Sequence, residues 1–115
     1  MHAVVAVALM LASLVVALPS AAAKERTAGE LLAACEAKSE YCDGFLAGTL
    51  SAHRVRDSYS AVISGDQLLC IPDDLGVQTY IAQYIAYAKD RQKEHHWEGS
   101  AIALATLEHF HACHK

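Results

Sequence analysis

The sequence predicts an all-α protein: a small bundle of about four helices, held by disulfides and preceded by a cleaved signal peptide. Three observations indicate this fold class. Apolar residues recur at helical spacing in four successive segments of the 115-residue chain. The first 23 residues carry no charged side chain, and all four cysteines follow them.

Residues 1–23 have the composition of a secretory signal peptide. The segment from Val4 to Leu18 is almost entirely apolar, and Pro19 and small residues lead from it to Ala23. An apolar core followed by a helix breaker and small residues is typical of a cleaved signal. The apolar run is short for a membrane span, which needs about 20 residues. We expect cleavage after Ala23, with a retained anchor as the alternative, and a domain comprising residues 24–115.

The charges and cysteines of this domain restrict its class. Its net charge of −4 argues against nucleic acid, whose binding proteins carry a basic patch. An even number of cysteines in an exported chain favours disulfides, and four cysteines allow three pairings. We favour Cys35–Cys42 and Cys70–Cys113, the second of which closes a large loop worth about 4 kcal/mol in the chain-entropy model. The cysteine spacings match no zinc-binding pattern.

The first two helices have clear N-terminal signals. Thr27 and Glu30 form the S/T-x-x-E pattern of a capping box, which predicts a helix from Thr27 to about Lys38. Ser39 can cap a second helix, from Glu40 to about Arg56. This second helix contains a packing motif of two small and two aromatic residues: Tyr41, Gly44, Phe45 and Gly48.

The two glycines of this motif need a physical reason, because glycine costs about 1 kcal/mol against alanine inside a helix. Gly44 and Gly48 are four residues apart and share one helix face, where another backbone can approach closely. We expect that they allow tight packing inside the monomer. The alternative is a close interface with a second chain, which would make a homodimer.

A loop and a third helix follow. Serine, glycine, aspartate and glutamine residues predict a loop from Asp57 to Leu69, with Tyr59, Val62 and Ile63 packed down onto the domain. The third helix is expected from about Leu75 to Lys93. Its apolar stripe comprises Val77, Ile81, Tyr84, Ile85 and Ala88, which leaves Tyr80 and Tyr87 exposed.

A second loop, Glu94–Gly99, leads into a last helix from about Trp97 to Ala112. Ala101, Leu104, Leu107 and Phe110 would form its core face. Loops carry recognition more often than frameworks do, so both loops are candidate partner-binding surfaces. Trp97 either covers the core or contacts a partner. The candidate binding residues are Tyr59, Asp66, Gln67, Glu94, His95, His96 and Trp97.

Motifs for catalysis are missing from the sequence. It contains no nucleophile elbow, H-E-x-x-H motif, P-loop or dinucleotide fingerprint. A histidine-rich C-terminus, with His109, His111 and His114, could hold a soft metal only if Cys113 were reduced. We therefore expect a binding protein with no catalytic residues, no metal and no cofactor.

Taken together, the motifs resemble those of a known family. The matching segments run from Thr27 to Cys113: L-L-A-A-C at 31–35, Y-C-D-G-F-L-A-G at 41–48, C-I-P at 70–72, the 78–87 helix, and an alanine-rich last helix closing on Phe110 and Cys113. This combination resembles the Rap/Tai immunity proteins, which protect Gram-negative bacteria against peptidoglycan-cleaving effectors of the type VI secretion system. Ala112 and the 94–99 segment depart from the family, which often has proline at these places.

The resemblance implies a periplasmic, non-catalytic protein that binds a cognate peptidoglycan hydrolase, an amidase, and blocks its active cleft. It would contact neither nucleic acid nor, after cleavage of the signal, the membrane. The alternative function is a periplasmic chaperone-like or stress-response binding module without a toxin partner.

Overall fold

The computed structural model describes residues 24–65 and 67–113 and contains four α-helices there. They are α2 (Ala28–Glu36), α3 (Glu40–Ser64), α4 (Val77–Lys89) and α5 (Gly99–His111), and a short 3₁₀ helix, η1 (Gln92–Glu94), precedes α5. The described ranges have no β-strand, only two isolated bridges, Thr27–Glu98 and Leu69–Ala112. The expected all-α class is confirmed. The expected signal peptide lies outside the described residues.

Local capping explains where α2 and α3 begin. The Glu30 amide donates to the Thr27 hydroxyl at 3.2 Å, and the Thr27 amide donates to the Glu30 carboxylate at 3.0 Å, as the capping box predicts. The hydrogen bond from the Thr27 backbone lowers the pKa of Glu30. Ser39 caps α3 by accepting a hydrogen bond from the Cys42 amide. Between the two helices, Lys38 takes a positive φ of 56° in the turn.

The length of α3 differs from the prediction. We expected a loop from residue 57, but the helix continues to Ser64 and ends at Gly65, whose φ of +75° suits a C-cap glycine. Asp57, which resembled a turn residue, is only 7% exposed. Its carboxylate accepts hydrogen bonds from the Leu69 amide at 3.1 Å and the Gln67 side chain at 3.0 Å. These partners lie 10 and 12 residues away, so the helical pattern alone did not indicate them.

The buried faces of two helices differ in part from the predicted ones, although Ile81, Tyr84 and Ala88 of α4 are buried as expected. In α4, Tyr80 is buried rather than exposed, and its hydroxyl donates to the Ala103 carbonyl at 2.6 Å. In α5, Ile102, Ala103, Thr106 and Leu107 are buried, whereas Phe110 is 41% exposed and Ala101 is also exposed. The buried face of α5 is therefore turned about the helix axis, relative to the predicted face, by about the angle between one residue and the next. The predicted stripes left out Tyr80 and Thr106, whose hydroxyls donate hydrogen bonds inside the core to the carbonyls of Ala103 and Ile102.

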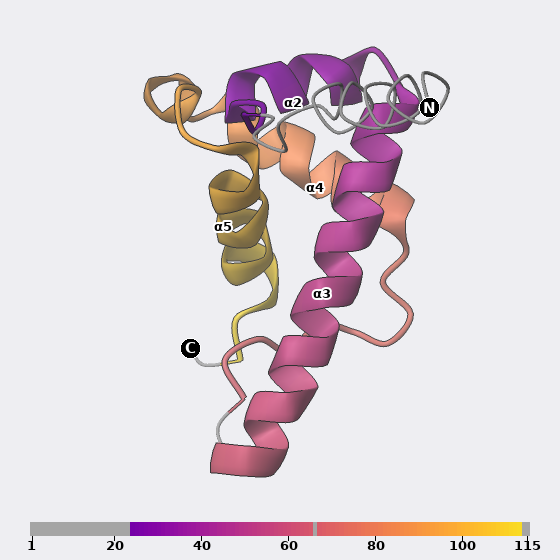
Figure 1. The fold of residues 1–115 in the computed structure, drawn as a ribbon, viewed down its shortest axis with the longest axis vertical. Helices are drawn as coiled ribbons and strands as arrows, with labels where there is room; N and C mark the ends of the chain where they lie inside the picture. Colours follow the sequence, from indigo (N-terminus) through magenta and orange to yellow (C-terminus); the bar gives the residue numbers. More distant parts are fainter. Residues whose placement is uncertain (1–23, 66, 114–115) are drawn as a thin grey trace, which may run out of the picture.

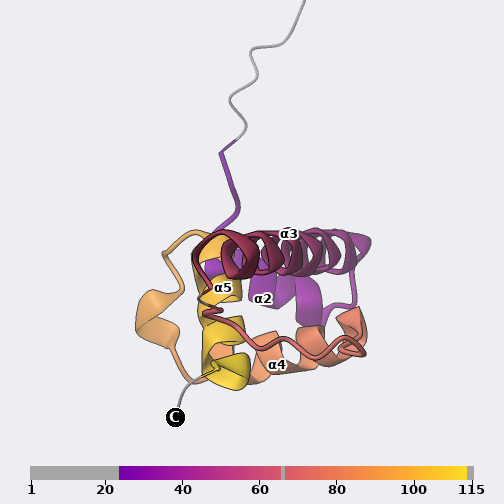
Figure 2. The same ribbon diagram turned by 90° about the horizontal axis from the view of Figure 1, so that it is seen from below.

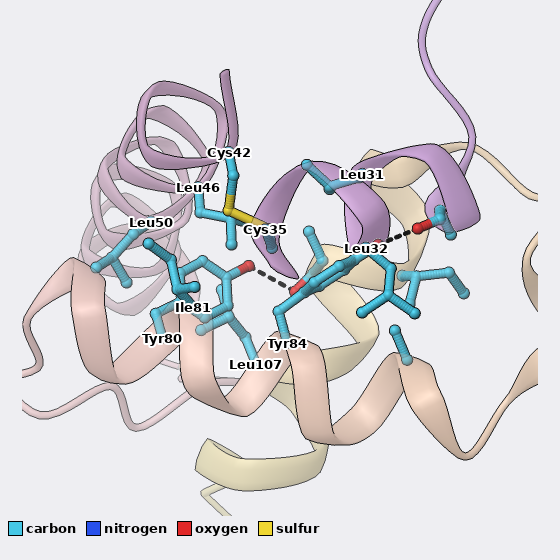
Figure 3. Packing of buried hydrophobic residues seen from close by; sticks show 14 of the residues in the cluster. Leu31, Leu32, Cys35, Cys42, Leu46, Leu50, Tyr80, Ile81, Tyr84 and Leu107 are labelled. Carbon is cyan, nitrogen blue, oxygen red and sulfur yellow. Dashed lines mark hydrogen bonds between the residues drawn. A yellow bond between two sulfur atoms is a disulfide. The ribbon is translucent and has the colours of Figure 1, made fainter. Parts of the chain in front are cut away.

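The core is formed where all four helices meet. Figure 3 shows Leu46 and Leu50 of α3 facing Tyr80 and Ile81 of α4 across this core. The Tyr84 hydroxyl donates to the Ala28 carbonyl of α2 at 2.8 Å. Burial raises the pKa of both tyrosines, Tyr80 and Tyr84, so both hydroxyls stay protonated as donors.

Two disulfides cross-link the helices in the favoured pairing. Cys35–Cys42 joins α2 to α3 inside the core (Figure 3). Cys70–Cys113 joins the segment after α3 to the end of α5. Backbone hydrogen bonds reinforce this second link, because the Cys70 amide donates to the His111 carbonyl at 2.7 Å. The two ends of the bundle are therefore fixed independently.

The arrangement leaves α3 on the outside of the bundle. Figure 1 shows its C-terminal end projecting past the other helices, and Figure 2 shows α2, α4 and α5 all on one side of it. Arg54 holds the loop before α4 against α3, because its guanidinium donates to the carbonyls of Pro72 and Leu75, each at 2.9 Å. No helix in the described ranges is long and apolar enough to span a membrane.

Candidate functional site

The two predicted binding loops lie at opposite ends of the molecule. Figure 1 shows the 94–99 segment beside α2 at the top and the projecting end of α3 at the bottom. Tyr59 and Gln67 belong to the lower end, and Glu94, His95, His96 and Trp97 to the upper one. Asp66 lies outside the described residues. The fold therefore offers two separate surfaces instead of one combined site.

At the projecting end of α3, apolar side chains face solvent. We expected Tyr59, Val62 and Ile63 to pack onto the domain, but all three are exposed, Val62 by 83%. The reason is the extra length of α3, which carries these residues beyond the core on the outer side of the helix. Gln67 is also exposed, but its side-chain amide donates a hydrogen bond to the Asp57 carboxylate. Of the described candidates here, Tyr59 has the larger apolar surface open to a partner.

The upper loop is held rigidly by backbone hydrogen bonds to the start of α2. The amides of Ala28 and Gly29 donate to the carbonyls of Trp97 and His95 at 2.7 and 3.0 Å. The Gly99 amide donates to the Arg26 carbonyl at 3.0 Å. These bonds fix the loop on both sides of Trp97, which reduces the conformational entropy that binding would otherwise cost.

His95 faces the protein and holds the loop in place. Its Nε2 lies 2.7 Å from the Ala88 carbonyl at the end of α4. Its Cβ would lie 3.1 Å from a Cβ placed on Gly29, so a larger residue at that position of α2 would crowd His95. Sequence reasoning missed Gly29, because a glycine inside a capping box carries no signal of its own.

Trp97 and His96 form the exposed surface of this loop. The indole is 49% exposed, and the His96 ring meets it edge-on at a centroid distance of 6.3 Å. Trp97 therefore neither covers the core fully nor stands free of the protein. A half-exposed tryptophan on a fixed backbone is the type of residue that anchors protein interfaces.

A shallow cavity of about 470 Å³ adjoins the same loop. It is lined by residues 89–94: Lys89, Asp90, Arg91, Gln92, Lys93 and Glu94. Two of its cations are already engaged, because Lys89 pairs with Glu36 at 3.3 Å and Arg91 lies over the Tyr87 ring at 3.6 Å. Basic and acidic side chains alternate here, so the surface suits a polar protein partner better than an anion.

The glycine pair of α3 faces solvent, and our expectation of tight packing inside the monomer was wrong. A Cβ added at Gly44 or Gly48 would meet no atom within 4 Å. Around them, the Tyr41 and Phe45 rings contact each other at 5.8 Å, and the Arg26 guanidinium lies 3.8 Å above the Tyr41 ring. The two glycines are thus open to solvent, whereas Tyr41 and Phe45 are half-buried and pack against the core.

The C-terminal histidines bind neighbouring side chains. His109 contacts the Tyr87 ring at 5.2 Å, and the His111 Nε2 lies 3.0 Å from the Gln83 side-chain oxygen. His114 lies outside the described residues. Among the residues that are described, no group of three histidine, cysteine or acidic side chains is placed to hold a metal ion.

Comparison with known proteins gives one match. A family model described as Rap1a immunity proteins matches residues 27–113, which include all four helices and both disulfides. Neither the comparison with curated proteins nor that with solved structures found a match.

Proposed function

The chain belongs to the Rap1a immunity protein family, and we propose that it inhibits a peptidoglycan hydrolase delivered by a type VI secretion system. The family implies that the chain gives immunity by binding a cognate effector. We propose the periplasm as the place of action, which fits the expected signal peptide at residues 1–23 and the two disulfides. We further propose that the effector is an amidase, as the resemblance of the sequence implies.

Inhibition would work by surface complementarity without catalysis. The single observation that supports this most is the fixed loop at Trp97, whose flanking residues bond to α2 and α4. A rigid loop that already has its bound shape loses little entropy on docking. Trp97 would enter a recess of the effector, with His96 beside it and the charged side chains of residues 89–94 forming the rim.

A binding experiment tests this proposal. The mature protein, used as bait for envelope and effector proteins, should retain a peptidoglycan hydrolase identified by mass spectrometry and abolish its activity on purified peptidoglycan. Replacing Trp97 with alanine should weaken binding by about 30-fold, because an interface anchor of this kind contributes about 2 kcal/mol. The variant should keep its fold, because residue 97 holds the loop through its backbone carbonyl, which accepts a hydrogen bond from the Ala28 amide.

Phe110→Ala is the matched control. Phe110 is an exposed aromatic of α5 outside the loop, so its loss should leave inhibition unchanged. Equal effects of the two substitutions would contradict the assignment of the Trp97 loop. Failure of the protein to retain or inhibit any wall hydrolase would contradict the proposed peptidoglycan hydrolase target.

A further inference from the structure

The two disulfides differ in their access to solvent. Cys35 and Cys42 are 3% and 1% exposed, and Figure 3 shows their bond, the inner disulfide, inside the core between α2 and α3. Cys70 is exposed and Cys113 is half-buried, and we call their bond the outer disulfide. A thiol in solution can therefore approach Cys70 in the folded protein, whereas the inner disulfide is reached only when the core opens.

The surroundings of the outer disulfide are open as well. Figure 1 shows it at the lower end of the molecule, where the chain after α3 passes the end of α5. Leu68 is 67% exposed, Phe110 is 41% exposed, and Ala112 is also exposed. A reagent would thus meet this bond without displacing a helix.

Hydrogen bonds hold the two outer cysteines in place without their covalent bond. The Cys70 amide donates to the His111 carbonyl at 2.7 Å, and the next residues form the Leu69–Ala112 bridge. Leu69 is only 2% exposed, and its amide donates to the buried Asp57 carboxylate at 3.1 Å. Opening the outer disulfide leaves these contacts intact, so the two thiols stay adjacent and can pair again.

We propose that the outer disulfide is a thiol–disulfide exchange site of the folded protein, opened and closed by a dithiol oxidoreductase while the inner disulfide stays intact. A thiolate of the dithiol attacks the Sγ of Cys70, the more exposed of the two sulfurs. The bond between the cysteines breaks, and the Sγ of Cys113 leaves as a thiolate that takes up a proton. The second thiol of the reagent then attacks the mixed disulfide, which releases Cys70 as a thiol and the reagent as a disulfide.

This exchange passes two electrons and two protons from the dithiol to the protein, and the reverse sequence closes the bond. The position of Cys113 decides which reductants work. A monothiol such as glutathione forms the mixed disulfide with Cys70, but Cys113, held beside it, displaces the monothiol and restores the bond. A dithiol overcomes this reversal because its second thiol acts within the same complex, at a high effective concentration.

Opening the outer disulfide should change the stability more than the structure. The bond joins residues 43 positions apart, so its loss mainly frees the unfolded chain. The four helices keep their packing, and the melting temperature should fall by at least about 10 °C. The thiol–disulfide state of the surroundings would then control how long the protein stays folded. This inference does not depend on the identity of the effector.

Partial reduction of the native protein tests the proposal. The oxidised protein is treated with dithiothreitol at about pH 8, where thiolates form, and free thiols are capped with iodoacetamide at intervals and located by mass spectrometry. Caps should appear on Cys70 and Cys113 at least about 100-fold faster than on Cys35 and Cys42, whose exposure requires opening of the core. Glutathione at the same thiol concentration should leave most of the outer disulfide closed.

The form with one remaining disulfide is then isolated. Circular dichroism should show its helices intact, and a disulfide oxidant should restore the outer bond without prior unfolding. Equal rates of opening for the two disulfides would overturn the proposal. A one-disulfide form without helices, or glutathione that opens the outer bond as completely as dithiothreitol, would also contradict it.

Two substitutions supply matched free thiols. Cys113→Ala leaves Cys70 unpaired at the surface, and Cys42→Ala leaves Cys35 unpaired in the core. A chromogenic aromatic disulfide should react with Cys70 in the folded protein and with Cys35 only in urea. If Cys42→Ala fails to fold, the rates measured on the unsubstituted protein still decide the proposal.

Discussion

Removing the Cys70–Cys113 disulfide tests how much of the stability comes from chain entropy. The two cysteines are 43 residues apart, and a closed loop of this length should contribute about 4 kcal/mol by limiting the unfolded chain. Cys70 is exposed and Cys113 is half-buried, so replacing both with alanine leaves no sizeable cavity. We expect this double variant to lose about 4 kcal/mol of its free energy of unfolding.

The second disulfide gives a contrasting case. Cys35–Cys42 spans only 7 residues, which corresponds to about 2.4 kcal/mol by the same relation. Both of its cysteines are buried in the core, so two alanines would also leave gaps of about methyl size, each worth about 1 kcal/mol. The two double variants should therefore lose similar totals for different physical reasons.

Urea unfolding separates these reasons. Opening the longer loop exposes more surface in the unfolded chain, so the denaturant slope should increase more for the 70/113 variant than for the 35/42 variant. Circular dichroism at increasing urea gives both the slope and the free energy. A loss below about 2 kcal/mol for the 70/113 variant, with an unchanged slope, would refute the entropic reasoning.

Three further predictions concern the core, the glycines and pH. Tyr84→Phe removes a buried hydroxyl that bonds to Ala28 and should cost about 1 kcal/mol in urea unfolding, whereas Tyr59→Phe, at an exposed position, should cost nothing measurable. Gly29→Ala should lower the melting temperature because its Cβ crowds His95, whereas Gly44→Ala should raise it because open space leaves only the gain in helix propensity. Burial lowers the pKa of His53, with Arg56 acting the same way and Glu108 opposing, and burial also lowers the pKa of His111. The unfolded chain therefore binds protons more readily, so stability should be complete above pH 6.5 and fall as the pH drops below it. Thermal melts should show a melting temperature that falls as the pH drops from about 7.5 to 5.5. A variant with both His53→Leu and His111→Gln should show a smaller decrease over this range.

Local signals in the sequence were enough for several elements. The capping box at Thr27 and the Ser39 cap placed the starts of α2 and α3, because their hydrogen-bond partners lie three residues away. The spacing of apolar residues predicted four helices, because residues three or four positions apart lie on one face of a helix. The favoured disulfide pairing also appears in the structure.

The candidate site was less predictable. The sequence indicated the segment around Trp97 and predicted that His95 contacts a partner, as its neighbours would. In the structure the His95 ring bonds instead to the Ala88 carbonyl. The sequence placed Tyr59 in a loop, whereas the residue stands on the outer side of a long helix. For His95 the deciding contact is with a residue seven positions away in α4, which the local pattern does not indicate.

Local signals in the chain were sufficient for the helical class, the starts of α2 and α3 and the motifs shared with an immunity family, since these rest on neighbours along the chain. They favoured the observed disulfide pairing, but two other pairings stayed open. Only the tertiary structure decided where α3 ends, which faces of α4 and α5 are buried, and that Gly44 and Gly48 are open to solvent. The end of α3 and the buried face of α4 depend on partners far along the chain, Leu69 for Asp57 and Ala103 for Tyr80. A buried polar group looks like a surface residue until its distant hydrogen-bond partner is known.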